Sequence, residues 1–125
     1  MVALTQGRAS PIGSACMELV CNLVEGDLPV LQIRGEVDLA TLPLLRDQLT
    51  RAIAAHHGRT VAVDVDGLIA LDDTGMGMLL GAAGRAREHG GDVVLVCSDA
   101  RLRQRFAVTG LDRALQVYER LSDAG

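Results

Sequence analysis

Two adjacent carboxylates, Asp72 and Asp73, are the residues whose type and position most suggest chemistry in this chain. They follow the apolar run 68–71 and precede a threonine and two glycines. Carboxylates in apolar surroundings cost free energy unless they lie at a surface or have partners. Such a pair could transfer protons, hold a hard cation, cap a helix or bind a basic group of a partner.

The pair lies between a predicted strand and a predicted helix. Residues 60–65 are rich in β-branched side chains, as in a buried strand. Residues 74–89 show helical periodicity and end at two glycines. Functional groups of open α/β sheets collect outside the carboxyl ends of strands, and a helix N-terminus stabilises an anion there. On this pattern alone, Asp73 or Thr74 is predicted to cap the helix.

The sequence does not favour a catalytic or metal site at this junction. Asp64 and Asp66 lie nearby, but their spacing to the acid pair matches no calcium loop. An acid–base pair would need a cleft and a substrate-positioning set, and the sequence shows neither. No serine or cysteine nucleophile is placed near a base. We therefore predict a protein that is not an enzyme, with no catalytic residue, metal or cofactor.

Composition narrows the function further. The 125 residues are 49% hydrophobic and 22% charged, which is typical of one globular domain. A formal charge of −4 and only two aromatic side chains disfavour nucleic-acid binding. All twelve basic residues are arginine, so Schiff-base chemistry and a phosphate-loop lysine are excluded.

The sequence predicts a cytoplasmic protein that does not bind a membrane. Residues 1–16 lack the charged start and apolar run of a secretory signal, and no apolar run approaches the roughly 20 residues that span a bilayer. Cys16, Cys21 and Cys97 show no metal-ligand spacing. We interpret them as reduced thiols, with a redox disulfide as the alternative.

The hydrophobic pattern predicts a single α/β domain at residues 16–125 behind a loose arm at 1–15. An antiparallel hairpin comes first, and strands then alternate with helices, which favours parallel pairing and right-handed crossovers. The predicted order is β-β-α-β-α-β-α-β in a mostly parallel mixed sheet. Its segments are strands within 17–24, 30–37, 60–65, 92–97 and 114–118, and helices within 38–58, 74–89 and 98–110.

Two further patterns are open to interpretation. Gly77, Gly81 and Gly84 recur at helical spacing, which predicts a helix face that packs closely on the sheet. Arg101, Arg103 and Arg105 form a basic run on the third predicted helix. This run is either a solvated face or a patch that binds a partner.

Three segments together resemble the STAS domain, the family named for sulfate transporters and anti-sigma factor antagonists. They are VLQIRGEVDLAT at 30–41, TVAVDVDGLIALDDTGMGMLL at 60–80 and GGDVVLVCSDARLRQRFAVTGLDRALQVY at 90–118. The resemblance runs from about residue 17 to 121. As a short chain with one domain, it is most similar to bacterial anti-sigma factor antagonists.

The resemblance implies a mechanism. Such antagonists bind an anti-sigma factor, often an ATP-dependent serine kinase, and so release a sigma factor. The kinase switches them off by phosphorylating a serine in the family pattern Asp-Ser-Ser/Thr-Gly-hydrophobic-Gly. Here the pattern reads Asp-Asp-Thr-Gly-Met-Gly at 72–77, so Asp73 takes the acceptor position. The implied partner-binding residues are Asp38, Asp72, Asp73, Thr74, Gly75 and Met76.

The aspartate at the acceptor position leaves three hypotheses open. Asp73 imitates the phosphorylated off state in part, since a phosphate carries about −1.5 to −2 charge and aspartate carries −1. Alternatively, the partner is adapted to the charge and no phosphorylation switch operates. In the third hypothesis, Thr74 is a displaced acceptor. A STAS scaffold or sensor, or a module that binds a small ligand such as a nucleotide, is the alternative function. The sequence leaves a monomer and a weak homodimer equally open.

Overall fold

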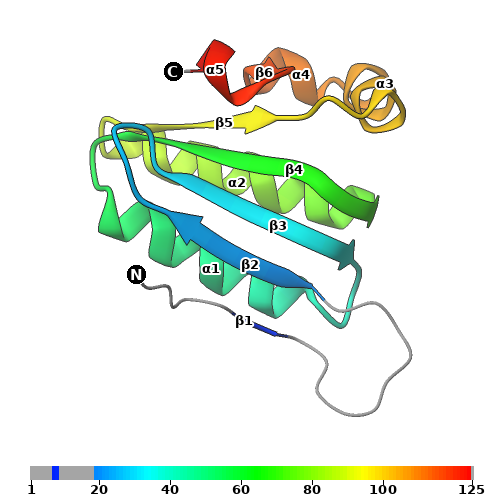
Figure 1. Cartoon of the computed structure of the whole chain (residues 1–125), viewed down its shortest axis with the longest axis horizontal. Helices are drawn as coiled ribbons and strands as arrows, with labels where there is room; N and C mark the ends of the chain where they lie inside the picture. The colour runs from blue at the N-terminus through cyan, green and yellow to red at the C-terminus, as the bar shows by residue number, and fades with distance from the viewer. Residues whose placement is uncertain (1–6, 9–18, 125) are drawn as a thin grey trace.

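The computed structural model describes residues 7–8 and 19–124, and these form one six-stranded sheet with five helices (Figure 1). The strands lie side by side in the order of the chain. They are β1 (Gly7–Arg8), β2 (Val20–Val24), β3 (Val30–Val37), β4 (Thr60–Leu71), β5 (Asp92–Val96) and β6 (Val117–Tyr118). The helices are α1 (Leu42–Ala55), α2 (Asp73–Glu88), α3 (Ala100–Thr109), α4 (Leu111–Ala114) and α5 (Leu121–Ala124).

The pairing confirms the predicted α/β class. β1, β2 and β3 are antiparallel neighbours, and β3 through β6 run parallel. One departure lies in the predicted loose arm, where Gly7–Arg8 pairs with β2. The rest of the arm lies outside the described residues, as does Cys16 at the start of the predicted domain. The short α4 is a second departure, because four residues are too few to show a helical period.

α1 and α2 lie together on one face of the sheet and cover the main core (Figure 1). Leu19 and Cys21, which alternate along the first hairpin, are fully buried there. Phe106 of α3, a fully buried aromatic side chain, joins the same core. Val30, Ala62, Val94 and Val96 form a smaller cluster of buried residues. No helix in the described part of the chain is long and apolar enough to cross a bilayer.

The predicted packing of the glycine stripe of α2 on the sheet is wrong. Gly77, Gly81 and Gly84 are exposed, and a Cβ at Gly77 or Gly84 would meet no atom within 4 Å. The buried face of the helix instead consists of Gly75, Met76, Leu79, Ala82, Ala83 and Ala86. The spacing of the stripe is helical, but its phase is opposite to that of the alanines, which are the small residues that lie on the sheet.

Candidate functional site

The register of the two central strands brings Asp38 and Asp72 side by side. Val37 is paired with Leu71 at the end of the parallel strands β3 and β4, and each aspartate is the next residue of its chain segment. Both are exposed and lie at the carboxyl edge of the sheet. The structure therefore places two acids that are 34 residues apart in the sequence at one edge, where α/β proteins collect functional groups.

Asp38 is held by the turn that leads into α1. Its Oδ1 accepts hydrogen bonds from the backbone N–H groups of Ala40 (3.0 Å) and Thr41 (3.1 Å). The buried Thr41 hydroxyl donates to the carbonyl oxygen of Glu36 at 2.9 Å, which ties the turn back to β3. The carboxylate of Asp38 is thus fixed in position although it is exposed.

Asp72 is the N-cap of α2. Its backbone is extended (φ −87°, ψ 177°), and its Oδ1 accepts from the N–H of Gly75 at 2.9 Å. The predicted cap, Asp73 or Thr74, is wrong by one or two positions. Asp73 is already the first helical residue, whereas a cap needs a residue with non-helical backbone just before the helix.

Asp73 forms an ion pair with Arg105 of α3. The guanidinium donates to Asp73 Oδ1 at 2.9 Å and, through its other terminal nitrogen, to the carbonyl oxygen of Leu71. The Asp73 side chain is 85% exposed and the Arg105 side chain 43% exposed, so the pair lies at the surface. The charge of Asp73 is therefore balanced within the chain.

The other two arginines of the run differ from Arg105. Arg103 donates to the carbonyl oxygen of Cys97 at 3.0 Å, at the end of β5. Arg101 is 85% exposed, and its nearest acid, Asp99, is 3.8 Å away. The run is therefore not uniform, since two arginines tie α3 to strand ends and one projects into solvent. Periodicity could not separate them, because these ties depend on contacts across 6 and 34 residues.

The six predicted partner-binding residues divide into an exposed and a buried group. Thr74 is exposed beside the acids, in the first turn of α2. Gly75 and Met76 are buried, and the Met76 sulfur receives a contact from the Thr109 hydroxyl at 3.9 Å. These two residues support the site from below, and Asp38, Asp72, Asp73 and Thr74 form its surface.

The nearby aspartates of β4 do not join this surface. Asp66 accepts from the backbone N–H (2.6 Å) and the hydroxyl (3.1 Å) of Ser98, beyond the end of β5. Asp64 accepts from the N–H of Asp66. Among the residues that the structure describes, no three His, Cys, Asp or Glu side chains converge as metal ligands.

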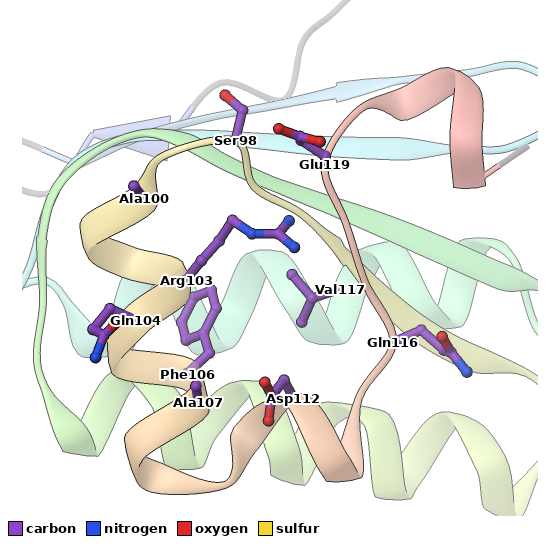
Figure 2. A pocket seen from close by; sticks show the side chains of 10 residues that line it. All are labelled: Ser98, Ala100, Arg103, Gln104, Phe106, Ala107, Asp112, Gln116, Val117 and Glu119. Carbon is purple, nitrogen blue, oxygen red and sulfur yellow. The ribbon is translucent and has the colours of Figure 1, made fainter.

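A cleft lies between α3 and the segment that carries β6. Its volume is about 570 Å³. Figure 2 shows the Arg103 guanidinium in this space, facing Val117 and Glu119 across it. Two of the polar groups here have partners within the chain, since Arg103 donates to a backbone carbonyl and Ser98 donates to Asp66.

The described cysteines are buried and free. Burial raises the pKa of Cys21 to about 12 and that of Cys97 to about 11. Their thiols are therefore protonated at neutral pH, and thiols react through the thiolate. This favours the interpretation as inert, reduced thiols for these two residues.

The chain is similar to known proteins of one family. The family model of the STAS domain matches residues 22–124. An anti-sigma-B factor antagonist of Bacillus subtilis is 29% identical over 93 residues, which cover 74% of this chain and 83% of that protein.

Two solved structures share the fold. The crystal structure of an anti-sigma factor antagonist from Mycobacterium paratuberculosis superposes with a TM-score of 0.76 at 22% identity, and the match covers 85% of this chain and 90% of that one. The Bacillus cell fate determinant SpoIIAA in its phosphorylated form gives a TM-score of 0.61 at 21% identity, over 85% of this chain and 95% of that one.

Proposed function

The chain belongs to the STAS domain family, and from this premise we propose that it is an anti-sigma factor antagonist. It would bind an anti-sigma factor in the cytoplasm, and the anti-sigma factor would then release its bound sigma factor. The relatives named as anti-sigma-B factor antagonists support this function. The activity is binding, so any ATP chemistry belongs to a partner of the serine-kinase type.

The observation that carries the proposal is the surface of Asp38, Asp72, Asp73 and Thr74 at the carboxyl edge of β3 and β4. Two of its carboxylates are fixed by backbone N–H groups, so they lose little conformational freedom when a partner binds. Carboxylates held in this way suit an arginine of the partner, which can donate two hydrogen bonds at once. Gly75 and Met76 keep the surface in place from below.

Of the three hypotheses on Asp73, we propose the one in which the interface is adapted to its charge. Arg105 balances the single charge of Asp73, whereas a phosphoserine beside the same arginine would leave a net charge of about −0.5 to −1, since phosphate carries about −1.5 to −2. Asp73 is therefore a poor imitation of a phosphorylated residue. Thr74 stays a candidate acceptor, because its hydroxyl is at the surface.

The proposal is tested by a pull-down from a lysate of the source organism. The baits are the native protein, Asp73→Ser, and Asp112→Ser as a control that removes an exposed acid of α4. Bound proteins are identified by mass spectrometry. The captured anti-sigma factor is then purified with its sigma factor, and release of the sigma factor is measured as native protein is added.

The expected result is that the native and control baits retain one anti-sigma factor and that the native protein displaces its sigma factor. Retention by Asp73→Ser alone would mean that the native aspartate is a built-in off switch. If no bait retains an anti-sigma factor, the proposed function is wrong and a scaffold or sensor role replaces it. Phosphate on Thr74 of the recovered native bait would identify the displaced acceptor.

A further inference from the structure

An exposed isoleucine stands beside the proposed partner surface because of an irregularity in β4. Gly35 of β3 is paired with Leu68, and Glu36, the next residue, is paired with Ala70. Ile69 is therefore an extra residue on β4 that has no partner on β3. Such bulges redirect a side chain and are frequent next to functional sites. Here the bulge leaves Ile69 58% exposed.

Ile69 borders a groove of about 500 Å³ between the carboxyl ends of β3 and β4 and the first turns of α3. Three further apolar side chains that line the groove, Val37, Leu71 and Leu102, are buried core residues, and the small Ala70 is exposed beside Ile69. The groove is therefore a shallow apolar depression whose base is rigid. It is continuous with the surface defined above, because Asp38 and Asp72 line both.

The rim of the groove carries both signs of charge. Asp38 and Asp72 lie on the side of the strand ends, and Arg101 and Arg105 lie on the side of α3. Within the described residues, each aspartate bonds only through Oδ1, which leaves its Oδ2 for a partner. Arg105 is engaged by Asp73 and a backbone carbonyl, so Arg101 is the cation that is available.

We propose that this groove receives a segment of the anti-sigma factor that inserts a large apolar side chain against Ile69. A basic residue of the same segment faces Asp38 and Asp72, and an acidic residue faces Arg101. The inference rests on the proposed function, whose partner it describes. Protein interfaces usually have apolar anchor residues at the centre and charged residues at the rim. The opposite charges on the two sides would set the direction in which the segment lies.

The test measures the affinity of the purified anti-sigma factor, as captured above, for matched pairs of variants. Ile69→Ser is compared with Val108→Ser, which alters an α3 residue that is 74% exposed and lies outside the groove. Arg101→Glu is compared with Arg120→Glu, an exposed arginine away from the groove. The melting temperature of each variant verifies that it is folded, and size-exclusion chromatography reports self-association.

Ile69→Ser is expected to weaken binding about tenfold, since it removes a large apolar contact area. Arg101→Glu is expected to weaken it about fivefold, with a changed salt dependence, and neither control should differ from the native protein. If Ile69→Ser and Arg101→Glu both bind normally while Asp72→Asn binds weakly, the groove proposal is wrong and the proposed function stands. If the native protein binds no anti-sigma factor, both fail. A native dimer that Ile69→Ser dissociates without a loss of anti-sigma affinity would assign the groove to a second copy and overturn the proposal.

Discussion

Gly75 allows α2 to begin directly on the ends of β3 and β4, and replacing it with alanine should destabilise the domain. A Cβ at this position would lie 2.6 Å from Leu71 Cδ1 and 2.7 Å from Val37 Cγ1. Both neighbours are buried to within 2% of their surface, and the valine is stiff at χ1, so neither can move aside freely. The helix must therefore shift away from the strand ends that carry the site.

The size of the effect follows from two opposing contributions. Overpacking of a core costs about 1–3 kcal/mol. Alanine is favoured over glycine within a helix by up to about 1 kcal/mol, which offsets part of this cost. We expect Gly75→Ala to lower the free energy of unfolding by about 1–2 kcal/mol. For a domain of this size the melting temperature would fall by roughly 4–8 °C.

Gly77→Ala is the matched control, because it lies two residues further along the same helix with nothing within 4 Å of the new Cβ. Only the propensity contribution applies there, so the variant should be more stable than the native protein by about 0.5–1 kcal/mol. Urea unfolding of both variants, followed by circular dichroism, measures the two free energies. A Gly75→Ala protein as stable as the native one, or a destabilised Gly77→Ala protein, would refute this account of how α2 packs.

The remaining predictions concern the helix cap and the buried thiols. Asp72→Ala should cost about 0.5–2 kcal/mol of unfolding free energy because it removes the cap, whereas Asp73→Ala should cost under about 1 kcal/mol because it breaks only an exposed ion pair. Urea titration of both variants checks this order, and the reverse order would show that Asp73 is the structural acid. Cys21 and Cys97, whose pKa values burial raises to about 12 and about 11 from 9.0, should react with a thiol reagent at pH 8 only after unfolding. Since the folded state keeps these protons longer than the unfolded chain, their contribution to stability should be complete below pH 9 and be lost as the pH rises toward 11–12.

Most of the longer elements of this fold can be predicted from the sequence because their causes are local, whereas the short α4 and the second half of β4 were not predicted. Apolar residues repeat at helical spacing in α1, and β-branched residues fill β4 and β5. The ends of α3 are equally local, since Asp99 caps it through the N–H of Arg101 and Gly110 ends it with a φ of 83°. Helices, strands and helix ends that depend only on residues close together in the sequence can be predicted without a structure.

The phase of a helix on the sheet is a different kind of information. The glycine stripe of α2 and its alanines both have helical periodicity, so either could face the sheet. The choice is made by the larger apolar residues Met76 and Leu79, which are buried with the alanines. Burial of Met76 and Leu79 on the sheet stabilises the fold more than burial of the three glycines would, because the glycines have no apolar side chain to bury. Weighting the stripe by apolar area would have predicted the correct face.

The site depends most on features that no local pattern contains. Asp38 and Asp72 become neighbours only through the parallel register of β3 and β4, and Ile69 becomes exposed only because that register contains a bulge. The counter-charge of Asp73 comes from Arg105, 32 residues away. Asp72 and Asp73 could be recognised as unusual from the sequence alone. Their neighbours Asp38, Arg105 and Ile69 are placed beside them only by the fold. Binding of a partner to this surface therefore depends on the register of the sheet, so a substitution that shifts α2 or changes the pairing of β3 with β4 should impair binding.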